Sequence, residues 1–312
     1  MNNLFDKNEI TILVTDSGLG GLSVAADLAA RLPKSGIFEK ARIIFFNALF
    51  HPGSGYNFLP SEEEKVRIFN IALQAMEEKY HPDIILIACN TLSVIYDQTP
   101  FAKKTKVPVL GIVETGVDLI AEQFDNNPDA SAIIFATQTT IETNSHKNML
   151  IKRGYEKEKI IGLPCSMLAD YIEEGANSEM TTFVISEYVS QALEKTNKPS
   201  APIFASLNCT HYGYSMEQFK AAFKDAGYPD IKIINPNPEM SNFLFNKKYI
   251  NRYSETEINV DVVSKTKITE AKIASLGKLV EKISPQTAEA TKNYKYDPDL
   301  FDAKFDSSRI GL

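Results

Sequence analysis

The sequence predicts an α/β protein with two similar domains, each a mostly parallel sheet flanked by helices. Three observations lead to this prediction. Short apolar runs alternate with helical stretches along most of the 312 residues. The run 83–89 (DIILIAC) is almost continuously apolar, which is typical of a parallel strand covered on both faces. The alternation starts again near residue 131, and no Gly/Ser-rich or Pro-rich linker divides the chain.

The first half of the chain contains four predicted strands and two predicted helices. One helix runs from Leu22 to Pro33. A longer helix starts at Ser61, where Glu64 three residues later completes a capping box. The predicted strands are 10–14, 42–46, 83–89 and 107–113.

The second half repeats the pattern and then extends it. A strand at 258–264 and a helix at 269–283 come last, and we expect them to return to the first domain. The four strands before them are 131–137, 159–165, 201–209 and 230–235.

These positions suggest where the domains begin and end. We assign residues 1–110 and 236–312 to the first domain, and 111–235 to the second, with the active site in the cleft between them. After Pro285 the chain is polar and weakly periodic. The segment 285–312 is therefore predicted to be an extra tail that wraps the surface or is partly ordered.

Composition narrows the class of protein. Lys and Arg total 33 and Asp and Glu total 40, a net charge of −7, which argues against nucleic-acid or anionic-membrane partners. The longest clean apolar run is about six residues, whereas a membrane span needs about 20. The start, MNNLFDKNEI, lacks the pattern of a secretory signal. Three cysteines do not make a disulfide framework, so a reducing cytoplasm is the simpler expectation.

Polar residues follow three of the predicted strands. Ligands of open α/β sheets bind beyond the carboxyl ends of the strands. The segment TDSGLGG after the first strand is not a dinucleotide fingerprint, because Ser23 stands where the third glycine would be, and it lacks the lysine of a P-loop. It is either a loop that approaches an anion or a tight capped turn. The three polar segments are Asp16-Ser17, Cys89-Asn90-Thr91 and Cys209-Thr210-His211.

Two cysteines, Cys89 and Cys209, occupy matching places in the two predicted domains. A free cysteine is commonly just a small buried hydrophobe, and we interpret Cys165 in that way. Cys89, Cys209 and His211 could instead ligate a metal, but no CxxC or HExxH pattern supports this. A Cys-His nucleophile is a further alternative. Two thiols facing one cleft also suit inversion of a stereocentre, since one can remove a proton while the other donates one.

At these positions the sequence resembles the cofactor-independent aspartate/glutamate racemase family over about residues 10–283. The three carrying motifs are DSGLGGLSV (16–24), ACNT (88–91) and CTHY (209–212), and softer matches include VPVLGIVETG (107–116) and IEEG (172–175). The resemblance implies interconversion of L- and D-glutamate without a cofactor or metal, which would supply D-glutamate for peptidoglycan. It also implies a homodimer in the cytoplasm, with a small acidic amino acid as substrate.

The resemblance implies roles for individual residues. Cys89 and Cys209 would be the acid/base thiols, with Asp16 and His211 as polar helpers beside them. Residues implied to bind the substrate are Asp16, Ser17, Tyr56, Asn57, Asn90, Thr91, Thr210 and His211.

The loop that the resemblance implies to contact the substrate side chain departs from the family pattern. Where the family has Pro-Tyr-Gly, this chain has Gly55-Tyr56-Asn57. The alternatives are therefore the same two-thiol reaction on aspartate or another acidic amino acid, or an inactive relative that binds such a molecule. A pyridoxal phosphate racemase would need a Schiff-base lysine, and an absorbance band would reveal it.

Overall fold

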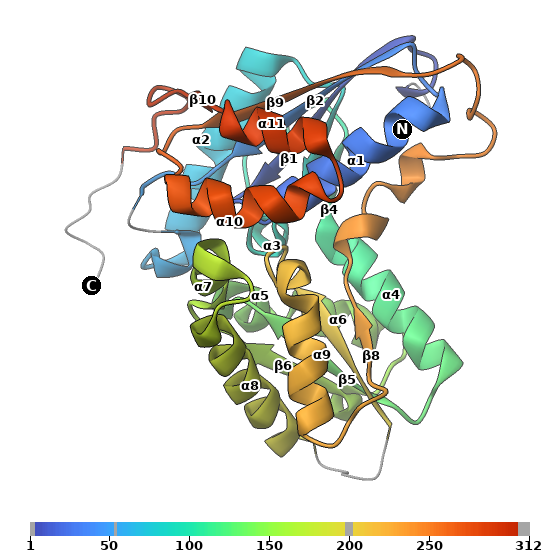
Figure 1. Cartoon of the computed structure of the whole chain (residues 1–312), viewed down its shortest axis with the longest axis vertical. Coiled ribbons are helices and arrows are strands. Elements are labelled where there is room, and N and C mark those ends of the chain that lie inside the picture. The colour runs from blue at the N-terminus through green and yellow to red at the C-terminus, as the bar shows by residue number, and fades with distance from the viewer. Residues whose placement is uncertain (1–3, 53–54, 197–201, 305–312) are drawn as a thin grey trace.

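The chain forms two lobes, each built on its own parallel sheet (Figure 1). A computed structural model describes residues 4–52, 55–196 and 202–304. Every strand pairing within the two sheets is parallel, and helices pack against them. The α/β fold class predicted from the sequence is confirmed.

The first lobe contains a six-stranded sheet in the order β10-β9-β2-β1-β3-β4. Helices α1, α2, α3, α10 and α11 belong to it, and β9 lies beside β2, so the chain returns to this sheet after building the second. Its elements are β1 (Glu9–Asp16), α1 (Leu22–Ser35), β2 (Lys40–Asn47), the 3₁₀ turn η2 (Tyr56–Phe58), α2 (Glu62–Tyr80), β3 (Ile84–Ile87), α3 (Asn90–Tyr96), β4 (Val109–Gly111), β9 (Glu257–Ser264), α10 (Glu270–Glu281), α11 (Pro285–Lys292) and β10 (Lys295–Tyr296).

The second lobe contains a four-stranded sheet in the order β6-β5-β7-β8. Short 3₁₀ turns connect it back to the first lobe, at Asn237–Glu239 and Asn242–Leu244. The domain boundaries at residues 110 and 235 stay predictions. The elements of this lobe are α4 (Ile112–Asn126), β5 (Ser131–Ala136), α5 (Gln138–Glu142), α6 (Ser145–Lys152), η3 (Lys157–Lys159), β6 (Ile160–Pro164), α7 (Leu168–Gly175), α8 (Glu179–Glu194), β7 (Ile203–Asn208), η4 (Tyr212–Ser215), α9 (Met216–Asp225) and β8 (Lys232–Ile234).

Local sequence signals explain where the two long helices of the first lobe begin and end. The Ser61 side chain accepts a hydrogen bond from the Glu64 backbone N–H at 3.3 Å, so α2 begins where the capping signal predicts. Helix α1 continues two residues past Pro33, which lies in its last turn, and ends at Gly36 in a left-handed conformation.

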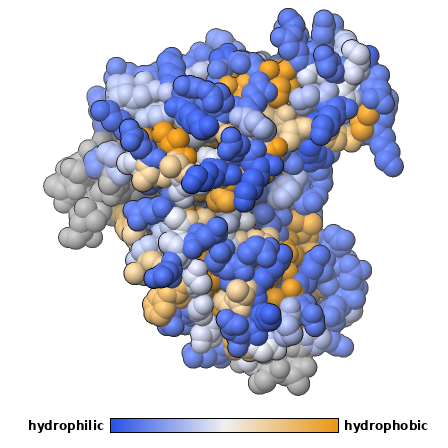
Figure 2. Space-filling model, viewed as in Figure 1, coloured by the Kyte–Doolittle hydropathy of each residue, from blue (hydrophilic) through white to orange (hydrophobic). Residues whose placement is uncertain are grey.

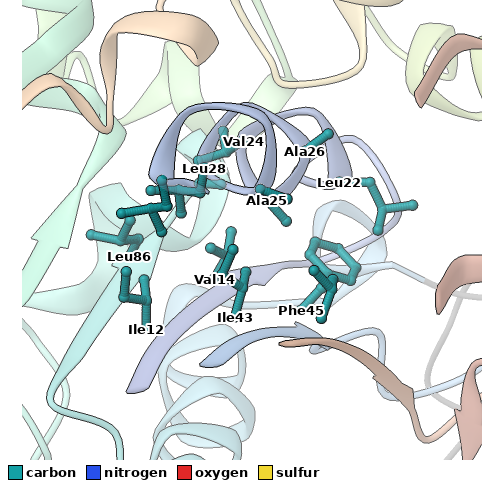
Figure 3. Packing of buried hydrophobic residues seen from close by; sticks show 14 of the residues in the cluster. Ile12, Val14, Leu22, Val24, Ala25, Ala26, Leu28, Ile43, Phe45 and Leu86 are labelled. Carbon is teal, nitrogen blue, oxygen red and sulfur yellow. The ribbon is translucent and has the colours of Figure 1, made fainter. Parts of the chain in front are cut away.

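Apolar side chains fill the space between α1 and the first sheet (Figure 3). Ile12 and Val14 from β1 and Ile43 and Phe45 from β2 face this helix and are fully buried. Hydrophilic residues cover most of the face drawn in Figure 2, and hydrophobic residues lie there in smaller groups. Among the described residues, no helix is long and apolar enough to cross a membrane.

The described part of the segment after Pro285 is ordered and packs on the first lobe. It contains α11 and the edge strand β10, and its assignment as an extra tail stays a prediction. Ala288 packs in the α1 side of the core, and Leu300 and Phe301 pack in the α2 side. These few apolar residues are irregularly spaced, so periodicity did not reveal that they anchor the segment. The remainder of the predicted tail, 305–312, lies outside the described residues.

Candidate active site

A cleft of about 410 Å³ opens between the two lobes. The residues that line it come from β-strand ends and from helices of both lobes. All ten residues proposed from the sequence line this cleft: Asp16, Ser17, Tyr56, Asn57, Cys89, Asn90, Thr91, Cys209, Thr210 and His211.

The first-lobe wall carries Cys89 beside Ser17. Strands β1 and β3 are parallel neighbours, so the residues that follow them meet at one edge of the sheet. Ser17 Oγ lies 3.1 Å from Cys89 Sγ, and the cysteine is only 5% exposed. Burial, and then the nearby Asp16 carboxylate, raise the pKa of Cys89 well above its usual value. This cysteine is therefore held as a neutral thiol.

The second-lobe wall carries Cys209 beside His211. Cys209 follows β7, is 6% exposed, and has its Sγ 3.7 Å from His211 Nδ1. The opposite ring nitrogen, Nε2, lies 2.7 Å from Glu173 Oε1. Burial opposes protonation of His211, but its hydrogen bonds to Cys209 and Glu173 outweigh burial and hold its pKa well above the ordinary value. An imidazolium therefore stands next to this second sulfur.

Two side-chain hydrogen bonds between residues that line the cleft join the two lobes. Thr210 Oγ1 donates to Asp16 Oδ2 at 2.7 Å, and the hydroxyls of Thr91 and Thr137 lie 2.8 Å apart. All four side chains are buried. The walls that carry the two thiols are thus linked through Thr91 and Thr210, each of which is next to or near a cysteine in the sequence.

Asn90 is a buried polar residue in the wall of the cleft. Neither atom of its side-chain amide is hydrogen-bonded within the described part of the chain. Buried polar groups are normally satisfied, so an orphaned amide that lines a cleft indicates a ligand contact.

Tyr56 and Asn57 line the cleft, and both side chains are hydrogen-bonded to the protein backbone. Tyr56 is buried, and its hydroxyl donates to the Ala48 carbonyl at 3.2 Å. Asn57 Oδ1 accepts a hydrogen bond from the Thr139 backbone N–H in the other lobe, at 3.3 Å. The side chain of Asn57 therefore links the two lobes.

Cys165 lies in the core of the second lobe. It is 2% exposed, and its Sγ is 3.6 Å from the Leu163 carbonyl. Burial raises its pKa well above the usual value. This placement fits a packing residue.

The cleft also contains charged residues that we did not propose from the sequence. Glu173 on α7 accepts from the Leu19 backbone N–H at 2.8 Å, and Lys272 on α10 donates to it at 2.6 Å. Burial opposes ionisation of Glu173, but the hydrogen bond and charge of His211 and the charge of Lys272 lower its pKa to about 2. The IEEG match was the only signal for Glu173, and nothing in the sequence pointed to Lys272. Asp170 and Thr137 also line the cleft.

Comparison with known proteins decides the family. The family model for Asp/Glu/Hydantoin racemase matches residues 19–198, more than half of the chain. The chain belongs to the Asp/Glu/Hydantoin racemase family. The resemblance in the sequence is thereby confirmed, and the protein is an enzyme of the racemase class, an isomerase.

Named members of this racemase family align over most of the chain. A glutamate racemase of Clostridium botulinum is 29% identical over 221 residues, covering 70% of this chain and 78% of the relative. A glutamate racemase of Persephonella marina is 25% identical over 248 residues, covering 76% of this chain and 82% of the relative.

Solved structures share the fold. Glutamate racemase of Campylobacter jejuni superposes with a TM-score of 0.66 at 21% identity, covering 87% of this chain and 98% of that one. Glutamate racemase of Francisella tularensis in complex with D-glutamate superposes with a TM-score of 0.63 at 23% identity, covering 93% of this chain and 95% of that one.

Proposed function

We propose that this racemase interconverts L- and D-glutamate by a two-thiol acid/base reaction that uses no cofactor. The curated relatives named above are glutamate racemases, which supports glutamate as the substrate. The observation that carries the mechanism is the pair of buried cysteines, Cys89 and Cys209, on opposite walls of one cleft.

The reaction requires a proton to leave one face of Cα and another to arrive on the opposite face. A thiolate breaks the Cα–H bond and becomes a thiol, and the electron pair stays on the substrate as a carbanion stabilised by its carboxylate. The opposite thiol then donates its proton to the other face of Cα and becomes a thiolate. The products are the opposite enantiomer and an enzyme whose two sulfurs have exchanged roles.

The two sulfurs have different surroundings, which suggests how the cycle starts. Burial and Asp16 favour the protonated form of Cys89, so it is the donor in the resting enzyme. The His211 imidazolium can donate a hydrogen bond to a thiolate at Cys209, so that cysteine is the base. The reverse reaction begins from the exchanged state.

Small polar groups around the thiols would hold the zwitterionic substrate. The orphaned amide of Asn90 is positioned to bind it, and Ser17, Thr91 and Thr210 offer hydroxyls that line the same cleft. Exclusion of water from a closed cleft strengthens each of these hydrogen bonds. Tyr56 and Asn57 would shape the end that receives the side-chain carboxylate.

The wider role we propose follows from the substrate. D-Glutamate would be supplied for peptidoglycan by a cytoplasmic homodimer whose ligand is a small acidic amino acid. An acidic protein of net charge −7 is consistent with the absence of a nucleic-acid or anionic-membrane partner.

The test is isotope exchange without added cofactor. Purified protein is incubated in D₂O with L-glutamate and, separately, with L-aspartate, while optical rotation and deuterium at Cα are followed. Exchange with glutamate alone supports the proposal. Exchange with aspartate alone keeps the mechanism and replaces the substrate, which the altered Asn57 loop makes a specific alternative. No change with either contradicts a racemase of acidic amino acids and favours an inactive binding relative.

Single cysteine variants test the mechanism itself. Cys89→Ser and Cys209→Ser should each abolish racemisation in both directions, because a serine hydroxyl is too weak an acid to replace the thiol. Circular dichroism and thermal unfolding check that each variant remains folded. Wild-type turnover by either folded variant would contradict the two-thiol mechanism.

A further inference from the structure

We propose that Lys272 is a positioning residue for the Cys209 half of the reaction, holding Glu173 against His211 across the interface between the two lobes. This inference rests on the proposed function. It assigns a role to a lysine that lies outside the motifs through which the chain resembles its family.

Lys272 reaches the cleft from the opposite lobe. Helix α10 is part of the first lobe, since its Leu276 and Val280 pack in the core with α1. Its first turn lies against α7 of the second lobe, where α10 passes over the end of that helix (Figure 1). The Lys272 side chain is about one-quarter exposed and lines the cleft, and its Nζ lies 2.6 Å from Glu173 Oε2. The ion pair therefore bridges the two lobes.

Glu173 divides its two oxygens between the lysine and the histidine. Oε1 accepts from His211 Nε2 at 2.7 Å and from the Leu19 backbone N–H at 2.8 Å. Oε2 accepts from Lys272. His211 in turn contacts Cys209 through Nδ1. A continuous line of contacts thus runs from a first-lobe helix to the second-lobe thiol.

The fixed position of Glu173 depends on partners from the first lobe. Its side chain is 8% exposed, so an oxygen that lost its donor would be buried without a partner, which is costly for a charged group. Both Leu19 and Lys272 belong to the first lobe. Opening the cleft would remove these two donors together and leave the carboxylate held by His211 alone.

The surrounding charges make Lys272 the cation that balances this site. Asp170 and Glu174 on α7 also act on Lys272, and Asp170 acts on both Glu173 and His211. Burial opposes the charge on Lys272, but Glu173, and then Asp170 and Glu174, raise its pKa above the ordinary value. Without this lysine, the carboxyl groups of Glu173 and Asp170 would face the one His211 imidazolium.

The test compares the pH dependence of racemisation in three variants. Lys272→Met removes the charge, Lys272→Arg keeps it, and Lys278→Met is the matched control, since Lys278 is exposed on the same helix. For Lys272→Met we expect kcat to fall about tenfold or more. We also expect the acidic limb of the rate profile to move to higher pH, because that limb reports the thiolate base, and without Lys272 the base lies near a Glu173 carboxylate whose charge is no longer balanced. Lys272→Arg should restore both values, and Lys278→Met should match the wild type.

Each result has a defined meaning. If Lys272→Met keeps the wild-type kcat and acidic limb, the inference is wrong while the racemase function stands. A lower kcat with an unmoved acidic limb also overturns it, since this indicates a structural effect only. If Lys272→Met does not fold, Lys272→Gln retains a hydrogen-bond donor without the charge, and a wild-type acidic limb in that variant overturns the inference. An inactive wild-type enzyme would contradict the proposed function instead.

Discussion

A methyl group added at Gly20 would press on the loop that carries the second thiol. Gly20 lies between β1 and α1 in the first lobe, directly against the 209–211 segment of the second lobe. A Cβ built on it meets Thr210 Oγ1 at 2.3 Å and both the backbone N and Nδ1 of His211 at 2.7 Å. The Thr210 hydroxyl can rotate only by giving up its bond to Asp16. The backbone nitrogen of His211 can move away from the added methyl group only if the backbone of the loop itself moves.

The size of the effect follows from these distances. Carbon atoms make their best contacts at about 3.5–4.0 Å, so the loop must retreat by about 1 Å. Overpacking of this kind costs about 1–3 kcal/mol. A 1 Å displacement of groups that position the reaction can cost about 100-fold in rate. For Gly20→Ala we therefore expect kcat to fall by about 100-fold, with a modest loss of thermal stability.

Polarimetry with L- and D-glutamate measures the rate, and thermal unfolding measures stability. Gly277→Ala is the control, because a Cβ there meets nothing within 4 Å and the residue lies inside α10. Alanine should stabilise this helix by about 0.5–1 kcal/mol and leave turnover unchanged. Wild-type turnover in Gly20→Ala would refute the argument that close contact between the lobes fixes the position of His211.

Three further outcomes are expected. Cys165→Ser should leave racemisation nearly unchanged and alter the free energy of unfolding by no more than about 1–2 kcal/mol, because a hydroxyl can also hydrogen-bond the Leu163 carbonyl. A loss of activity equal to that of the other cysteine variants would show that the wrong pair of thiols was chosen. Asn57→Gly removes one hydrogen bond between the lobes, worth about 0.5–1.5 kcal/mol. It should shift the preference between glutamate and aspartate by up to about tenfold. Unchanged kcat/KM for both substrates would contradict this role for the loop. Glu173→Gln removes the carboxylate that helps to hold the pKa of His211 high. An NMR titration should therefore show the imidazolium losing its proton at lower pH than in the wild type. A titration curve identical to that of the wild type would contradict the charge pairing.

The sequence predicted the strands well because their apolar runs are continuous and bounded by polar residues. Residues 84–87 form β3 inside the predicted 83–89, and 203–208 form β7 inside 201–209. Residues that directly follow such strands could be proposed for the site, because parallel strands bring their carboxyl ends to one edge. Cys89 and Cys209 were found in this way and lie on the walls of the same cleft.

Residues on helices were missed for a physical reason. Glu173 is one of two adjacent glutamates on an amphipathic helix, and Lys272 is one of several lysines on another. Charged residues in such helices are usually solvated, and only tertiary packing brings these two together from positions 99 residues apart. The helix and strand after Pro285 were not predicted because a few anchoring residues, rather than a periodic face, hold this segment in place.

The order of the strands has a consequence for the newly made chain on the ribosome. The neighbours β2 and β9 are joined by the hydrogen bond from Asn47 to Ser264, across 217 positions. At a synthesis rate of about 5–20 residues per second, β2 would be made roughly 10–40 s before β9 exists. During that interval its edge is unpaired and open to the wrong strand. The second lobe, whose strands all lie between residues 131 and 234, can finish folding first. A nascent chain stalled before residue 257 should therefore have a protease-resistant second lobe and a first lobe that needs protection by chaperones.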